Sequence, residues 1–172
     1  MTVSTVVLCP PLPGAAPAYD AADTADVLLE LPALDGVRVL SPYVDEPGAD
    51  DDARTQRAHW VAHLSIALAS GKAVAPVLLV VDGTAGGMAP ALGFSQKAAR
   101  RAVAGYVLVD AVVPAADDRG VDWPDAPVVY VASPAAPEPD TTQARLRGWD
   151  VVTIADASPA AVAAAIAEIA RR

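Results

Sequence analysis

The side chains in this sequence that could do chemistry stand at the ends of short apolar runs. Cys9 ends the first such run, Asp82 and Thr84 follow the third, and Asp110 follows the fourth. A carboxylate can act as a general base, and a hydroxyl or thiol can act as a nucleophile once a base takes its proton. If the runs are parallel strands, their ends meet at one edge of a sheet, where ligands bind in α/β proteins. That edge is therefore the candidate site.

The segment around Asp82 has the pattern of a buried strand that turns sharply into a helix. The apolar run Val77–Val81 stops at Asp82-Gly83-Thr84-Ala85-Gly86-Gly87, and an Ala-rich amphipathic segment follows at once. Such a turn brings backbone N–H groups and one side chain to the rim of the sheet. The turn has neither G-K-[ST] nor G-x-G-x-x-G, so it is not a P-loop or a dinucleotide turn. No cofactor is predicted.

The two histidines and the single cysteine are weaker candidates. His59 and His63 stand four apart, a spacing that could place two imidazoles on one metal ion. Because no third ligand is apparent, we expect them to face solvent or a partner, and no metal site is predicted. Cys9 excludes an internal disulfide, and without an apparent base it is expected to be buried and inert.

Six apolar runs, separated mostly by helical patterns, position these residues. None alternates cleanly with polar residues, so each is predicted to be a strand buried on both faces. The runs are Thr5–Cys9, Val37–Leu40, Val77–Val81, Tyr106–Val109, Val128–Val131 and Val151–Ile154, and the helices are Ala22–Leu31, Asp51–Ser70, Ala85–Val103 and Pro159–Arg172. Loops are expected at Asp45–Asp52, Pro114–Pro127 and Ser133–Asp140. The alternation predicts an α/β fold with a doubly wound, mostly parallel sheet of about six strands.

Length and composition exclude several classes of protein. The chain has 172 residues, so we expect one domain spanning 1–172. Its apolar content of 53% argues against disorder. The net charge of −9 disfavours nucleic acid and anionic membranes as partners, and no apolar run approaches the length of a membrane span. Without a recognisable targeting segment, a cytoplasmic location is expected.

Several segments together resemble one known family. Val6-Val7-Leu8-Cys9-Pro10-Pro11-Leu12-Pro13-Gly14 resembles the V-V-L-V-H-G-x-x-G oxyanion segment of α/β hydrolases, and Pro76–Leu92 resembles their strand, nucleophile elbow and helix. Ala104–Ala111 is similar to the strand that follows, V-A-G-L-V-L-V-D-A, and Trp123–Tyr130 and Arg147–Val151 look like the last two strands. The chain thus resembles small, esterase-like α/β hydrolases of actinobacterial type, without the N-terminal hairpin and without a lid.

Departures from the family pattern concern the catalytic residues. An alignment without gaps places Gly83 where the family has its serine, whereas a shift by one residue would place Thr84 there. Pro10 and Pro11 replace the His and Gly of the oxyanion segment, and neither can donate an N–H. Leu12 still carries an N–H, as does the residue after the elbow, so two donors could still meet an oxygen atom.

The family histidine is also absent. It would follow the last strand, where Ala155–Ser158 stands, and no histidine occurs beyond residue 63. Asp110 holds one position that the family uses for the triad acid, and Glu138 and Asp140 hold the alternative position. Without a histidine to orient, we expect Asp110 to cap a loop.

These observations lead to a first hypothesis of a degenerate hydrolase. It would bind a small acyl or carbonyl ligand, or a protein partner, in a cleft between Pro10–Gly14 and Gly83–Gly87. The binding residues would be Leu12, Gly83, Thr84 and Ala85.

Two alternatives stay open. One is an esterase-, thioesterase- or lyase-like enzyme that uses the oxyanion cleft with Thr84, or with Asp82 or Asp110 as general base, and it predicts a carboxylate with a raised pKa in the cleft. The other is an assembly role, in which surface left by the missing lid and hairpin pairs with a second copy or another protein.

Overall fold

The computed structural model describes residues 2–44, 52–115 and 123–172. Its strands are β1 (Thr5–Leu8), β2 (Arg38–Leu40), β3 (Val77–Asp82), β4 (Val103–Val109), β5 (Val128–Ala132) and β6 (Asp150–Thr153). Its helices are α1 (Ala21–Glu30), α2 (Ala53–Ser70), α3 (Ala89–Ala98), α4 (Glu138–Leu146) and α5 (Pro159–Ala170), with 3₁₀ helices η1 (Pro32–Leu34) and η2 (Gly83–Met88). None of the helices described is long and apolar enough to cross a membrane.

All six predicted strands are present in one parallel sheet. The strand order is β2-β1-β3-β4-β5-β6, so the chain moves outward from β1 to β2 and then returns to the other side of β1. Val6 of β1 pairs with Val39 of β2 on one side and with Leu78 of β3 on the other. The direction of the chain therefore reverses between β1 and β3, which makes their carboxyl ends the topological switch point. This arrangement confirms the predicted doubly wound α/β fold.

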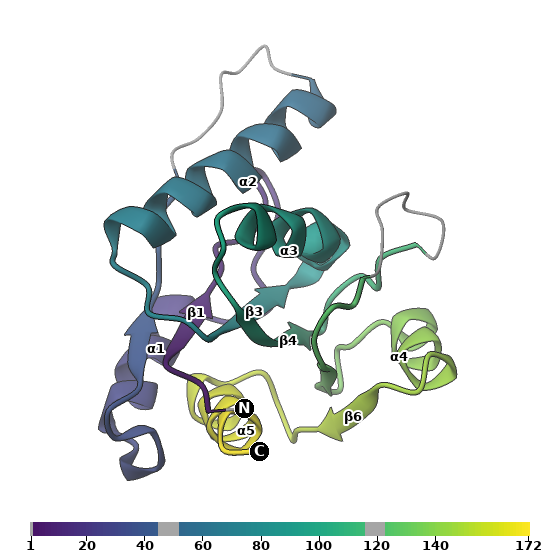
Figure 1. The fold of residues 1–172 in the computed structure, drawn as a ribbon. Helices are drawn as coiled ribbons and strands as arrows, with labels where there is room; N and C mark the ends of the chain where they lie inside the picture. The colour runs from purple at the N-terminus through teal and green to yellow at the C-terminus, as the bar shows by residue number, and fades with distance from the viewer. Residues whose placement is uncertain (1, 45–51, 116–122) are drawn as a thin grey trace.

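Helices cover both faces of the sheet because right-handed crossovers change face where the strand order reverses. In Figure 1, α1 and α5 lie on one side of the sheet, and α2 and α3 lie on the other. On the α1 side, Leu28 and Ile166 pack in a core with Val80 and Val107. On the α2 side, Trp60 and Leu92 belong to a second core with strand residues of the opposite parity. Successive strand side chains point to opposite faces, so one apolar run supplies both cores.

Local sequence signals explain several helix ends. Asp20 and Asp52 cap α1 and α2 through hydrogen bonds from the N–H groups three residues on. Ser158 caps α5, and Pro159 stands at its first position, where the predicted helix also begins. The Trp60 Nε1–H of α2 donates to the Pro10 carbonyl at 3.2 Å, which ties the loop after β1 to this helix.

The structure corrects two of the expected elements. The segment predicted as a loop at Ser133–Asp140 contains the start of helix α4, whose first turn holds Glu138 and Asp140. The predicted helix Ala85–Val103 is instead the 3₁₀ helix η2 followed by α3, and Val103 begins β4. Its glycine-rich start favours the tighter turn over an α-helix. Of the loop expected at Asp45–Asp52, all but Asp52 lies outside the described residues, and half of the loop expected at Pro114–Pro127 does as well.

Candidate functional site

The turn from β3 into η2 is built on a glycine in a left-handed conformation. Gly83 follows Asp82 directly and has a φ of +48°. A Cβ atom at Gly83 would lie 3.7 Å from the Ala16 carbonyl oxygen, so the conformation, and not space, favours glycine here. The Gly83 carbonyl accepts a hydrogen bond of 2.8 Å from the Val112 N–H, which fastens the turn to the end of β4. Gly83 is therefore the apex of a sharp strand-to-helix elbow.

A second glycine in the turn is required by close packing. A Cβ atom at Gly86 would lie 2.3 Å from the Val112 carbonyl oxygen and 2.8 Å from the Ala111 Cβ. By contrast, a Cβ atom at Gly87 would have nothing within 4 Å. Only the first two of these three glycines are fixed by the geometry of the elbow.

The predicted binding residues around the elbow differ in their exposure. Thr84 is exposed, and its hydroxyl has no hydrogen-bond partner among the described residues, whereas Ala85 is buried. Leu12 is half-buried, and its carbonyl accepts from the Ala15 N–H at 3.0 Å. In the part of the chain described, the Leu12 N–H makes no hydrogen bond.

Asp82, the last residue of β3, is buried with only half of its carboxylate satisfied. It is 2% exposed, and its Oδ2 accepts a hydrogen bond of 2.6 Å from the Ala18 N–H. Its Oδ1 is also buried and has no partner among the described residues. Burial raises the pKa of Asp82 above its ordinary value, the Ala18 hydrogen bond opposes this shift, and the nearby Asp110 charge adds to it. Asp82 thus has the raised pKa that a carboxylate base would need.

A small pocket of about 230 Å³ opens beside Asp82. Its lining residues are Cys9, Pro11, Pro17, Tyr19, Asp20, Ala21 and Asp82. The Tyr19 hydroxyl is buried and has no partner in the described chain, and burial raises the pKa of Tyr19 well above its ordinary value. Two unsatisfied polar atoms, one a carboxylate oxygen and the other a phenol oxygen, therefore belong to side chains that line the same pocket.

This pocket is not the cleft expected from the sequence. We expected a cleft between Pro10–Gly14 and Gly83–Gly87, but of those residues only Pro11 lines the pocket. The pocket lies instead toward the start of α1. The reason is strand parity, because Asp82 shares a face with Val80, which packs in the core on the α1 side.

Cys9 also lines the pocket beside Asp82. It is 2% exposed, and its Sγ makes only a long contact of 3.9 Å with the Val7 carbonyl. Burial, with a smaller effect from Asp82, raises the pKa of the Cys9 thiol far above its ordinary value. The thiol is therefore protonated at neutral pH, which leaves it a poor nucleophile.

Asp110 lies at the neighbouring strand end but is already held by other groups. Its Oδ1 accepts a hydrogen bond of 2.7 Å from the Ser133 N–H, and its Oδ2 accepts a short one from the Ser133 hydroxyl. It has a φ of +45°, a conformation that Asp tolerates better than most residues. Asp110 thus joins the ends of β4 and β5, and it is not among the residues that line the pocket.

The remaining candidates lie on helices α2 and α4. The rings of His59 and His63 stack at 3.8 Å, and the described residues contain no cluster of three or more metal-ligating side chains. The Asp140 Oδ1 accepts a hydrogen bond of 2.7 Å from the Val113 N–H, so this carboxylate also fastens a chain segment after β4.

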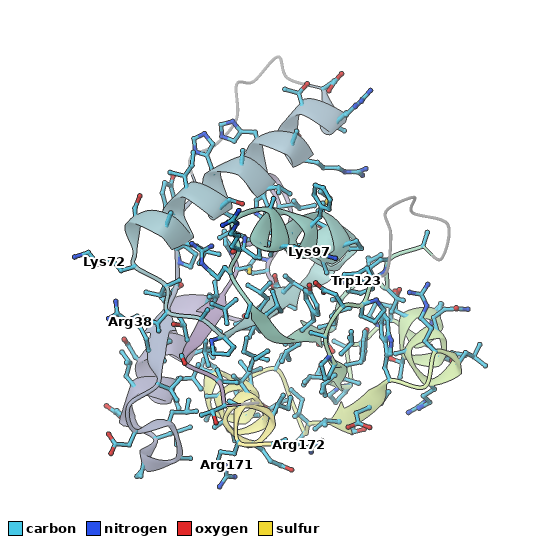
Figure 2. The ribbon with its side chains drawn as sticks, in the orientation of Figure 1. Arg38, Lys72, Lys97, Trp123, Arg171 and Arg172 are labelled. Carbon is cyan, nitrogen blue, oxygen red and sulfur yellow. The ribbon has the colours of Figure 1, made fainter. Side chains whose placement is uncertain are left out.

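A larger hollow of about 620 Å³ lies at the opposite edge of the sheet, where β5 and β6 begin. Trp123, Arg147 and Trp149 are among its lining residues, and the Arg147 guanidinium lies 5.1 Å from the centre of the Trp149 ring. Trp123 is labelled in Figure 2. Because this hollow adjoins the amino ends of the strands, it is separate from the elbow.

Sequence reasoning missed Tyr19 and the segment before α1. The Ala18 N–H donates a hydrogen bond to Asp82, which lies 64 residues further along the chain, and no local sequence pattern indicates such a contact. The one available signal was the N-cap Asp20, which places Tyr19 at the start of a helix that follows the loop after β1.

A parallel sheet with this switch point, helices on both faces and a strand–glycine–helix elbow is an α/β-hydrolase fold. The similarity to solved structures agrees with this assignment. The pyrethroid hydrolase PytH has a TM-score of 0.57 at 17% identity over 98% of both chains. The thioesterase domain of Vlm2 has a TM-score of 0.57 at 14% identity, over 98% of this chain and 90% of that one. The thioesterase domain of NocB has a TM-score of 0.54 at 17% identity, over 98% and 94%. No protein-family model and no curated protein matches the sequence.

Proposed function

We propose that this chain is a degenerate α/β hydrolase, acting as a single domain over residues 1–172, that binds a small ligand at the elbow instead of cleaving it. The observation that carries the proposal is the glycine at the apex. Gly83 has the left-handed φ of the elbow and no side chain to act as a nucleophile. The hydroxyl next along the chain, that of Thr84, is exposed and has no base within hydrogen-bond distance among the described residues.

The small number of histidines in the chain supports the same proposal. A hydroxyl attacks an ester only when a positioned base takes its proton, and such a base contributes roughly a hundredfold to ten-thousandfold in rate. The chain has only two histidines, His59 and His63, and their rings stack on each other in α2. The geometry of the turn persists without a triad.

The proposed ligand is a small acyl or carbonyl compound. The free Leu12 N–H and the backbone N–H groups at the start of η2 are the donors that its oxygen would meet. A protein partner or a second copy of the chain at the same edge is the other occupant that we consider. We place the protein in the cytoplasm on the sequence argument above.

The test uses short-chain nitrophenyl esters and a fluorophosphonate probe on the purified protein. We expect no saturable turnover and no covalent labelling, from either the natural chain or Gly83→Ser, because the new hydroxyl would have no base. Saturable turnover that Thr84→Ala abolishes would overturn the proposal.

A second candidate function rests on Asp82. The sequence-based alternative of an unusual enzyme requires a carboxylate with a raised pKa, and burial gives Asp82 such a shift. We propose Asp82 as its general base, with Asp110 as a positioning residue. Once an activity is identified, Asp82→Asn should abolish it, and an unchanged activity would remove this candidate.

A further inference from the structure

We propose that copies of this chain associate head to tail, with Phe94 of one copy seated in an acidic hollow at the end of α1 of the next copy. These surfaces lie away from the elbow, so the inference goes beyond the proposed function and does not depend on it. Phe94 of α3 and Leu29 of α1 are large apolar side chains, and each is 65% exposed. Single exposed apolar side chains are common on protein surfaces, but these two stand among charges of opposite sign.

The surface around Phe94 is basic. Residues 53–102 include six basic side chains and one acidic side chain, that of the buried Asp82. Lys97 lies one turn after Phe94 on α3, as its label in Figure 2 shows, and Arg100 follows the end of that helix. Both are exposed, and neither forms an ion pair with any residue that the structure describes. Phe94 is therefore an exposed apolar side chain beside exposed positive charge.

The surface around α1 is acidic. No basic residue precedes Arg38 in the sequence. Four exposed carboxylates belong to α1 and the segment between α1 and β2: Asp23, Asp26, Glu30 and Asp35. The carbonyl groups at the end of α1 add to this negative charge, because a helix C-terminus favours cations. Figure 1 shows α1 and α3 on opposite sides of the sheet, so the acidic and the basic surface face away from each other.

A hollow of about 340 Å³ lies where α1 ends. Leu29 and Pro32 are among its apolar lining residues, Glu30 and Asp35 also line it, and none of its lining residues is basic. A cavity of about 150 Å³ can hold a benzene molecule, so this hollow has room for one phenyl ring. It combines apolar contact with negative charge, which is the complement of the basic surface around Phe94.

The charges disfavour pairing of either surface with itself. Two copies that met at Phe94 would bring their Lys97 side chains together, and two copies that met at α1 would bring their carboxylates together. Like charges facing each other across an interface weaken it, whereas a contact between α3 and α1 joins opposite charges. Because the two surfaces lie on opposite sides of the sheet, each copy turns one surface to each neighbour, and the contact is heterologous. The net charge of −9 opposes association in other orientations.

Sedimentation velocity of the purified full chain, from micromolar to millimolar concentration, tests the association. We expect the mean mass to rise past that of a dimer, because a heterologous contact leaves one surface available at each end of the assembly. A chain that stays monomeric would overturn the proposal. A plateau at the dimer would overturn it as well, since it would indicate a two-fold contact.

Two single variants locate the contact. Phe94→Asp should disable the α3 surface and Leu29→Asp the α1 surface, and each should weaken association at least about thirtyfold, the cost of losing a hot-spot residue. A mixture of the two variants should give a one-to-one complex that does not grow, because each variant keeps one intact surface. Leu146→Asp is the matched control, since Leu146 of α4 is 75% exposed and should leave association unchanged.

The three substituted side chains are largely exposed, so the variants should fold, which far-UV circular dichroism checks. If Phe94→Asp does not fold, Lys97→Glu tests the same surface and should also weaken association. The proposal fails if the mixture of the two variants gives no complex, or if Leu146→Asp weakens association as much as they do. Ester turnover tests the proposed function separately, because the hollow is lined by no residue of the elbow and Phe94 lies beyond it on α3.

Discussion

Three neighbouring glycines in the elbow should respond differently to the same substitution. Gly83→Ala places a Cβ at ordinary contact distance, 3.7 Å from the Ala16 carbonyl oxygen, at a φ of +48°. Gly86→Ala places one 2.3 Å from the Val112 carbonyl oxygen, and Gly87→Ala places one where nothing lies within 4 Å. Each change adds one methyl group and removes the same backbone freedom from the unfolded chain. The three variants therefore separate conformational strain from steric overlap.

The expected magnitudes follow from these geometries. A left-handed conformation costs a residue with a Cβ about 1–2 kcal/mol. The lower entropy of the unfolded chain returns about 0.4–1 kcal/mol of that. Gly83→Ala should thus lower the free energy of unfolding by about 1 kcal/mol. Gly87→Ala should raise it by up to about 1 kcal/mol, and Gly86→Ala should lower it by about 3 kcal/mol or more, since backbone atoms must move.

Urea denaturation followed by far-UV circular dichroism measures all three variants against the natural chain. A change of 1 kcal/mol corresponds to about 2–4 °C in Tm for a chain of this size, so thermal melts give an independent check. Equal stability of Gly83→Ala and Gly87→Ala would contradict this expectation. Gly83 would then not be the strained apex, and Thr84 would return as the candidate nucleophile.

The side chains at the strand ends give three more predictions. The pKa of Asp82 in the folded chain is raised above its ordinary value of 3.8. The contribution of protonated Asp82 to stability is therefore complete below pH 3.8 and is lost as the pH rises through the folded pKa. In urea melts, the stability of Asp82→Asn relative to the natural chain should thus increase from about pH 4 to about pH 7. Ser133→Ala should lower the free energy of unfolding by about 1–3 kcal/mol in the same assay, because buried Asp110 loses a hydroxyl donor. Thr84→Ala removes an exposed hydroxyl and should change stability by less than about 0.5 kcal/mol; a larger loss would reveal a partner for that hydroxyl.

The strands and the elbow could be predicted because their signals are local. A run such as Val77–Val81 has no polar side chain to place at a surface, so it indicates a strand buried on both faces without reference to the rest of the chain. The same holds for the caps, since Ser158 followed by Pro159 begins a helix by its own chemistry. The doubly wound class of the sheet followed from the alternation of strands and helices, whereas the order of the strands was not predicted.

Helix α4 was missed because its composition argues against a helix. Two prolines, Pro137 and Pro139, stand at its start, and its apolar residues are few. Proline is tolerated in the first turn, where its missing N–H would have no intrahelical acceptor. Helicity there depends on packing, with Ala144 buried against the sheet, and packing cannot be read from the segment alone.

The pocket could not be predicted because it depends on one long-range contact. The bond from Ala18 to Asp82 joins the loop after β1 to the end of β3, and it fixes which carboxylate oxygen is satisfied and which is not. The sequence placed Asp82 at the edge of the sheet, but strand parity decides that it faces α1 and not the predicted cleft.

Asp82 lowers the stability of this fold. A chain kept only for its fold would be more stable with an apolar residue at this position, because a buried carboxylate with one free oxygen costs more than a packed side chain. Local rules are broken in natural proteins mainly at functional sites, where the loss is offset elsewhere. Gly83 has no side chain at the apex of the elbow, yet the residue before it has an ionisable group beside a pocket that Tyr19, with its unsatisfied phenol, also lines. The energetic cost at Asp82 is therefore a reason to examine the α1 side of the elbow as well as the proposed site at the start of η2.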